Sequence, residues 1–213
     1  IAWLTGVVFF DRRSARERTR VLRTIAYSYW DRILAVFPQG TTGSIAQRLQ
    51  AYREKLFKFV GDRNPLEVLA QTASKLAAVV RAHPSAVLRA RPLEDKWTPN
   101  EIIGHLVDSE WVYGYRLRLI LCEDNPTILG MNQELWVTGQ RYNERDPSEV
   151  VAMFQATRQI NLALWKRMSP ADLKRTGQHN ERGPESLGVM LRMLAGHDLS
   201  HLPPVDRHAQ PYA

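Results

Sequence analysis

Three histidines, His105, His197 and His201, are the residues of this 213-residue chain whose type and spacing could do chemistry. His197 and His201 stand four positions apart and continue an apolar stripe with helical steps of three and four residues. The apolar members of that stripe are Leu187, Met190 and Leu194. On a helix the two imidazoles lie one turn apart, close enough to share a metal ion. A lone His-x-x-x-His pair is not a specific signal for a metal site. A metal site also needs a third ligand from elsewhere in the chain, and His105 is the best candidate.

Three neutral imidazoles on two helices predict an open metal site, in which water or substrate completes the coordination. Such a site has the form of a catalytic centre, because a structural zinc is normally closed by a fourth protein ligand. The alternative is a set of buried histidines without a metal, which would need hydrogen-bond partners or would stay neutral.

Two carboxylates are predicted to support the ligands from outside. Asp108 lies one helical turn beyond His105, and Asp198 directly follows His197. Either could accept an imidazole N–H and so fix the tautomer of a ligand. The alternative for both is an ordinary solvated carboxylate.

Three further residues are weaker candidates for the wall of a pocket. Tyr142 lies near the end of the long connection after the helix of His105, and Arg116 lies three turns along that helix, too far away to be a ligand. His179 precedes the last helix and is a candidate to cover the open side of the site. The alternatives are a surface ion pair for Arg116 and a loop histidine without function for His179.

Four strong helices are predicted to position these residues. They are expected at about 65–82, 98–121, 146–168 and 186–202. The second begins with a capping box, in which Thr98 is the N-cap and Glu101 the third residue, and the third repeats this pattern with Asp146 and Glu149. A connection of about 25 residues allows the second and third helices to run parallel. No strand-like alternation of useful length separates the helices.

The end of the last helix is predicted at Pro203-Pro204. His201 would then lie in a fraying final turn, with uncapped carbonyls around it. This would make the site less rigid.

The net charge of +7 is unevenly distributed along the chain. Residues 1–50 carry eight arginines and three acids, whereas the remaining residues are nearly neutral, so we expect no nucleic-acid partner for the core domain. We predict a basic extension at 1–50 with a helix at 14–37 and a linker at 39–44. A core domain at 51–205 and a tail at 206–213 follow.

The sequence lacks a membrane-spanning segment or secretory signal and lacks a disulfide framework, and both features indicate where the protein is located. The apolar run at 1–10 is too short to span a bilayer, and its basic residues follow it, which is the wrong order for a secretory signal. Cys122 is the only cysteine, which excludes an internal disulfide framework and fits a reducing cytoplasm. We therefore predict a cytoplasmic protein without a transmembrane segment.

Three motifs together resemble the DinB-like (YfiT-type) domains. They are Trp-x-Pro-x-Glu-Ile-x-x-His-Leu-x-Asp-x-Glu at 97–110, Arg-Tyr-Asn-Glu-Arg-Asp-Pro at 141–147 and Gly-His-Asp-Leu-x-His-Leu at 196–202. The resemblance covers roughly residues 52–202. It implies an all-α fold, an up-down-down-up four-helix bundle, here with an extra N-terminal helical segment.

The resemblance also implies a divalent-metal-dependent enzyme acting on small molecules. Some DinB-like proteins are thiol S-transferases that use bacillithiol or mycothiol, a related domain serves a mycothiol-dependent isomerase, and many others are described as metal-dependent hydrolases. Zinc and nickel are the first expectations for the ion, with iron and copper as alternatives, and a low-molecular-weight thiol is the expected cosubstrate for transfer. Relatives often form homodimers through bundle faces. A non-enzymatic, metal-binding stress-response protein with a structural ion is the alternative function.

Overall fold

Four long helices make up most of the second of the two units into which the chain divides, residues 1–48 and residues 49–213. The helices are α3 (Pro65–Ala82), α5 (Pro99–Cys122), α7 (Pro147–Trp165) and α8 (Leu187–Ala209). The computed structural model describes residues 45–94 and 96–209. The helix predicted at 14–37 and the linker predicted at 39–44 lie outside the described residues.

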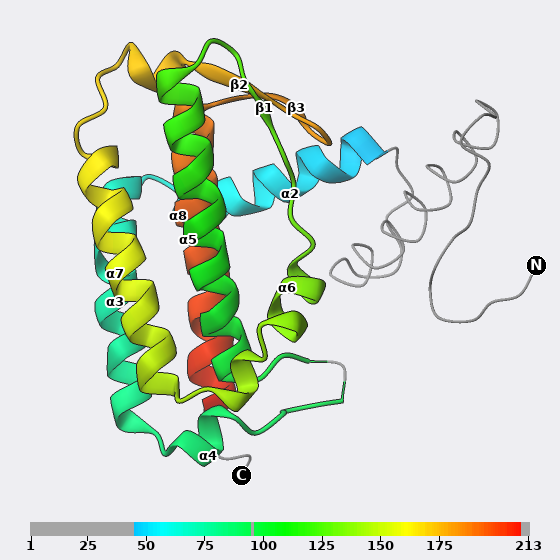
Figure 1. The fold of residues 1–213 in the computed structure, drawn as a ribbon, viewed down its shortest axis with the longest axis vertical. Helices are drawn as coiled ribbons and strands as arrows, with labels where there is room; N and C mark the ends of the chain where they lie inside the picture. Colours follow the sequence, from blue (N-terminus) through cyan, green and yellow to red (C-terminus); the bar gives the residue numbers. More distant parts are fainter. Residues whose placement is uncertain (1–44, 95, 210–213) are drawn as a thin grey trace, which may run out of the picture. The chain divides into compact units, whose positions relative to one another are not determined.

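The four helices form a bundle with the predicted up-down-down-up order. α3 and α5 each pack against both α7 and α8. Figure 1 shows that α5 and α7 run in the same direction, while α3 and α8 run the opposite way. The long connection after α5 returns along the bundle through α6 (Gln133–Gly139), which is what allows two successive long helices to be parallel.

The helix starts follow the local sequence. Thr98 accepts a hydrogen bond from the Glu101 backbone N–H, and the Glu101 side chain accepts one from the N–H of Thr98, so the predicted capping box is present. Asp146 caps α7 by accepting from the N–H of Ser148. α7 ends at Trp165, three residues earlier than predicted.

The predicted end of the last helix at Pro203-Pro204 is wrong, because α8 continues through both prolines to Ala209. A proline inside a helix removes a backbone hydrogen bond and crowds the carbonyl four residues earlier. Packing offsets this cost: Val205 is fully buried and Leu202 packs against the same apolar cluster. His201 therefore lies inside a continuous helix, with two further turns after it.

A small three-stranded sheet, which was not predicted, lies beyond one end of the bundle. β1 (Thr127–Ile128) pairs in parallel with β2 (Thr176–His179), and β2 pairs antiparallel with β3 (Gly183–Ser186). Strands of two to four residues carry too few side chains for alternation to be detectable. The remaining elements are α2 (Ile45–Val60), α4 (Ser85–Leu88) and the 3-10 helices η2 (Tyr142–Glu144) and η3 (Asp172–Lys174).

The core of the bundle consists of two apolar clusters with a buried polar layer between them. One cluster contains Leu69, Leu117 and Leu194, and the other contains Leu76, Phe154 and Val205, among others. On each long helix a buried polar residue lies between the stretches that enter the two clusters. These residues are Thr72 on α3, Glu110 on α5, Arg158 on α7 and Asp198 on α8. The candidate site lies beside this layer.

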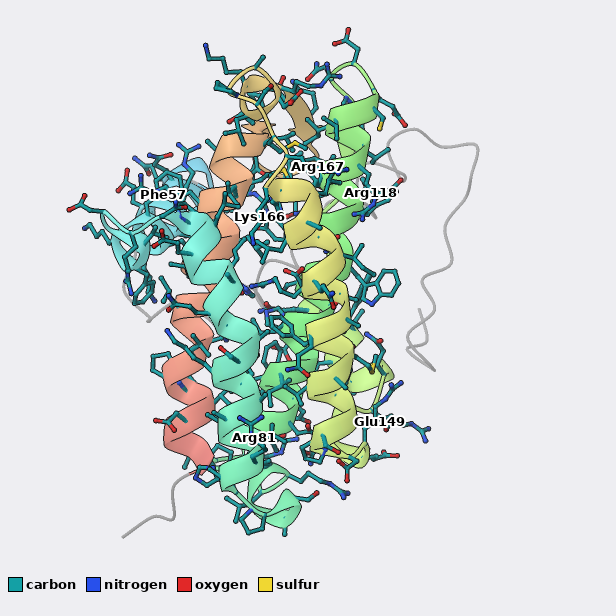
Figure 2. The ribbon with its side chains drawn as sticks, turned by 90° about the vertical axis from the view of Figure 1, so that its left-hand side faces the viewer. Phe57, Arg81, Arg118, Glu149, Lys166 and Arg167 are labelled. Carbon is teal, nitrogen blue, oxygen red and sulfur yellow. The ribbon has the colours of Figure 1, made fainter. Side chains whose placement is uncertain are left out.

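The outer faces of the helices carry charged residues together with exposed apolar ones, among them Trp111, Tyr115 and Ile160. Figure 2 shows α3 and α7 from outside, with Arg81 and Glu149 on the outer side of the bundle. Within the described part of the chain, every helix is too short or too polar to cross a membrane.

Candidate metal centre

The structure brings His105 of α5 together with His197 and His201 of α8. The Nε2 atoms of His105 and His197 lie 3.0 Å apart, and one nitrogen from each of the three rings lies within 4.8 Å of the others. The ring centroids are 4.5 to 5.0 Å apart, and the rings meet edge to face. The spacing of four residues therefore does place His197 and His201 on one face of a helix, and the packing of α5 against α8 supplies the third imidazole.

A glycine precedes two of the three histidines, and each glycine allows a close approach. A Cβ on Gly104 would lie 2.1 Å from the ring of Tyr142, and a Cβ on Gly196 would lie 2.3 Å from the carbonyl oxygen of Leu56 in α2. Any side chain at these positions would displace the neighbouring element. The two glycines therefore let η2 and α2 pack directly beside the histidines.

Burial keeps the three imidazoles neutral. Burial, followed by the charge of Arg158, lowers the pKa of His197 to about 4. Burial and the neighbouring histidines lower the pKa of His105 and of His201 well below the ordinary 6.5, although Asp198 acts in the opposite direction on His201. A neutral imidazole is the form that binds a metal ion.

The arrangement of these rings fits a divalent ion. A metal–imidazole bond is about 2.0–2.1 Å long, so two nitrogens on one ion are at most about 4.2 Å apart. The 3.0 Å between the Nε2 atoms of His105 and His197 is within this range, whereas the 4.8 Å that encloses all three nitrogens is about 0.6 Å wider, so binding of one ion by all three rings requires a small ring movement. The Nδ1 atoms of the same two rings are buried, and no described residue forms a hydrogen bond with them. An ion held by the two Nε2 atoms would not contact these Nδ1 atoms, so the close approach of the Nε2 atoms is the observation that fits a metal.

An aromatic residue covers one side of the cluster. The indole of Trp97 packs on His105 with ring centroids 5.0 Å apart, and its Nε1 donates to Glu134 of α6 at 3.2 Å. Trp97 directly precedes the N-cap of α5, so the capping box that starts the helix also positions this wall. The contact was not predicted.

Asp108 and Tyr142, both candidates from the sequence, contact each other rather than the imidazoles. The Tyr142 hydroxyl and the Gln140 amide donate to Asp108 Oδ1 at 2.8 and 2.6 Å. Asp108 Oδ2 is buried and has no hydrogen-bond partner among the described residues. Burial raises the pKa of Asp108, which these two hydrogen bonds only partly offset. One turn from His105, the structure therefore provides a buried carboxyl group with a free oxygen.

Asp198 faces the polar layer of the bundle, away from the histidine cluster. It accepts two hydrogen bonds from Arg158 at 2.7 and 3.1 Å, and Arg158 also pairs with Glu110 at 2.8 Å. Sequence reasoning missed Arg158 and Glu110. A signal was present, because Arg158 occupies a position on the apolar stripe of α7 formed by Val151, Phe154 and Trp165.

Arg116 and His179 lie together near the small sheet, apart from the three-histidine group. Arg116 is buried and donates to the carbonyl oxygen of Leu129. His179 is buried on β2, where burial and then the charges of Arg182 and Arg116 lower its pKa to about 3. The histidine cluster itself contains only His105, His197 and His201 within the described residues.

Comparison with known proteins gives a family match, a set of curated relatives and a solved structure of the same fold. Residues 69–203 match the family model of the DinB superfamily. A protein of Oceanobacillus iheyensis, named "Putative metal-dependent hydrolase OB0782", is 33% identical over 107 residues, which is 50% of this chain and 61% of that protein. A similarly named protein of Bacillus mycoides is 29% identical over 106 residues, 49% of this chain and 60% of that protein. The chain thus spans about three fifths of the length of these relatives.

A solved structure shows the same architecture. It is YfiT from Bacillus subtilis, described as a probable metal-dependent hydrolase with an unusual four-helix bundle topology. The match has a TM-score of 0.61 and 21% sequence identity, and it covers 80% of this chain and 91% of YfiT. At this identity the match establishes the fold.

Proposed function

The chain belongs to the DinB superfamily, and on that premise we propose that His105, His197 and His201 bind one divalent metal ion in an enzyme acting on small molecules. The observation that carries this proposal is the meeting of three imidazoles from two helices, two of them buried and that of His201 half-buried, with two Nε2 atoms 3.0 Å apart. Their lowered pKa values keep all three in the metal-binding form at neutral pH.

The ligand set favours an enzyme over a protein with a structural ion. Within the described residues the group offers three ligands, whereas structural zinc sites normally have four. Because the three imidazoles are neutral, they would not compensate the positive charge of the ion. A divalent ion held there would lower the pKa of a bound water or thiol and so supply a nucleophile at neutral pH.

Hydrolysis is the reaction class that the names of the relatives support. Thiol S-transfer, with a thiol of the bacillithiol or mycothiol type as cosubstrate, is the second candidate. The observation that favours it is the uncharged three-imidazole set, since a full positive charge stabilises a thiolate as well as it stabilises hydroxide. Zinc and nickel are the ions that we propose to test first, before iron and copper.

The residues around the cluster have roles in this proposal. Trp97 covers His105, so it would limit the access of water to one side of the site. Asp108, with one free buried oxygen and a raised pKa, would accept or hold a proton close to the reacting group. The hydrogen bonds from Tyr142 and Gln140 would hold that carboxyl group in place.

The test is a metal titration of the full chain followed by two assays. The protein is purified without an affinity tag, stripped with a chelator and titrated with zinc or nickel, and one equivalent should bind. The loaded protein is then assayed with activated esters and with a thiol plus an electrophile. Metal-dependent turnover in either assay supports the enzyme, and the assay that responds identifies the reaction class.

Two results would contradict the proposal. If the chain binds neither zinc nor nickel stoichiometrically, the proposed metal site is wrong. Tight binding that strongly raises the melting temperature, with no turnover in either assay, would instead support the structural ion of a non-enzymatic stress-response protein. The cytoplasmic location, the homodimer and the lack of a nucleic-acid partner stay predictions.

A further inference from the structure

One buried arginine connects the two helices that carry the three histidines. Arg158 of α7 donates through Nη1 to Asp198 Oδ2 at 2.7 Å and through Nη2 to Asp198 Oδ1 at 3.1 Å. The same Nη2 pairs with Glu110 Oε1 at 2.8 Å. The side chains of all three residues are at most 3% exposed. A guanidinium from a third helix thus holds one carboxylate of α5 and one of α8.

Two further contacts anchor this group within the bundle. Arg158 Nη1 donates to the carbonyl oxygen of Leu69 on α3 at 2.8 Å. The amide of Asn161, one turn along α7, donates to the carbonyl oxygen and to Oε2 of Glu110 at 2.8 and 3.0 Å. All four long helices therefore meet at Arg158, and its position is strongly constrained.

The carboxylates are close in sequence to the candidate ligands. Asp198 directly follows His197, and Glu110 lies five residues after His105, about 7.5 Å further along α5. Neighbouring residues on a helix are fixed about 100° apart and about 1.5 Å along its axis. A rotation or slide of α8 that separated Asp198 from Arg158 would therefore also turn His197 and His201 away from His105.

We propose that Arg158 is a positioning residue for the three-histidine site: by joining Glu110 to Asp198, it fixes the register of α5 against α8 in which His105 meets His197 and His201. This inference rests on the proposed metal site. Groups that orient metal ligands from outside typically contribute about 10–100-fold to metal affinity.

The test compares the zinc dissociation constants of the untagged full chain and of two Arg158 variants, at a temperature at which circular dichroism shows each to be folded. Arg158→Met removes both ion pairs and should weaken zinc binding about 100-fold. Arg158→Lys keeps the charge, but a compact ammonium cannot replace the bidentate fork, so binding should weaken about tenfold. If Arg158→Met does not fold, Arg158→Lys and Glu110→Gln decide, and each should weaken binding about tenfold.

The matched control is Arg182→Met, which breaks a different, partly buried ion pair. Arg182 pairs with Glu185 at 2.5 and 2.9 Å within one hairpin, so it does not connect α5 to α8. This variant should lower the melting temperature and leave the zinc dissociation constant within about twofold of the parent. A purely structural role of Arg158 predicts the same pattern for the Arg158 variants.

Zinc affinities within about twofold of the parent in the folded Arg158 and Glu110 variants would overturn the inference and leave the proposed function standing. If the parent chain binds no zinc and no nickel, the proposed function fails and this inference fails with it. Weakened binding in these variants, with the Arg182 control unchanged, would establish the positioning role.

Discussion

Two buried polar groups lie side by side on α5 and α8, and they use their polar atoms in opposite ways. In the Glu110–Arg158–Asp198 group the guanidinium contacts two carboxylates and a backbone carbonyl. In the three-histidine group, His105 and His197 contact each other through Nε2, and both Nδ1 atoms lack a partner among the described residues. The first group satisfies both Nη atoms of Arg158 and both oxygens of Asp198 and leaves only Arg158 Nε, with Glu110 Oε1 in an ion pair alone, without a hydrogen bond among the described residues, whereas the second group has only the contact between its own rings.

This difference distinguishes a group that stabilises the fold, that of Arg158, from a group that can bind a ligand, that of the histidines. Buried polar groups in folded proteins are nearly always paired, and an unpaired one indicates strain, function or a bound group. Both Nη atoms of Arg158 are engaged and its side chain is only 3% exposed, so its effect on chemistry must pass through the helices that it joins. The histidines carry the capacity for binding. Variants of the two groups should therefore fail in different ways.

The largest effect on stability is expected from Arg158→Met. Removing one partner of a buried ion pair leaves uncompensated charge in the core, which costs about 3–5 kcal/mol of the free energy of unfolding. The triple variant Glu110→Leu, Arg158→Met, Asp198→Leu removes all three charges and should be less destabilised than the single variant. Urea unfolding monitored by circular dichroism measures both. A single variant as stable as the parent would show that the group is not part of the scaffold.

The next effect is a pH dependence that belongs to the histidine group. In the folded chain the pKa of His197 is lowered to about 4, below the ordinary value of 6.5. The unfolded chain therefore binds a proton at a higher pH than the folded chain does. The resulting stability is fully present above pH 6.5 and is lost as the pH falls from 6.5 towards 4.

For His197 alone, the free energy of unfolding of the metal-free protein should fall by about 2 kcal/mol between pH 7 and pH 5. Urea unfolding at both pH values measures this decrease. In His197→Asn the decrease should be smaller by this amount, because the titrating imidazole is absent. An equal loss in His197→Asn and in the parent would place the titrating groups outside the histidine cluster.

A smaller effect is expected where the helix continues past the site. Pro203 is exposed inside α8, so Pro203→Ala restores a backbone donor and should raise the free energy of unfolding by about 1 kcal/mol. Zinc affinity should stay the same or increase slightly, because His201 lies in the preceding turn. Thermal unfolding together with a zinc titration measures both quantities. Destabilisation by this change would mean that the proline is required for the end of the helix.

The smallest effect is expected from deleting residues 1–44. Both polar groups, and the contacts described for them, are built from residues after position 49. The shortened chain should unfold cooperatively, within about 0.5 kcal/mol of the parent, and keep its metal content. A molten or insoluble product would show that the N-terminal segment supports the bundle.

The bundle was predictable because each long helix has its own local signals. The capping box at Thr98 and Glu101 and the proline at the start of α3 mark helix starts that the structure reproduces. The end of α8 was not predictable locally, because the packing of Val205 overrides the preference of two prolines. The sheet was missed because its strands are too short for a periodic signal.

The histidine cluster was predictable because two of its members share a helical face and the third belongs to a recognisable motif. The partners of Asp108 and Asp198 were not predictable. They depend on which residues of α7 and η2 lie near these two carboxylates in the folded bundle. No local sequence pattern predicts such contacts. Arg158 is an exception in part, since a charge on an apolar stripe indicates a buried pair.

The central claim, that one ion is bound by imidazoles from both α5 and α8, is tested most directly by the metal content of His105→Ala. Elemental analysis of this variant and of the untagged parent, each loaded with zinc and desalted, gives the two stoichiometries, and the thermal midpoints are measured beside them. The parent should retain about one equivalent, and the variant should lose most of it while keeping its helix content. A full equivalent of zinc in His105→Ala would contradict the claim, because α5 would then not supply the third ligand.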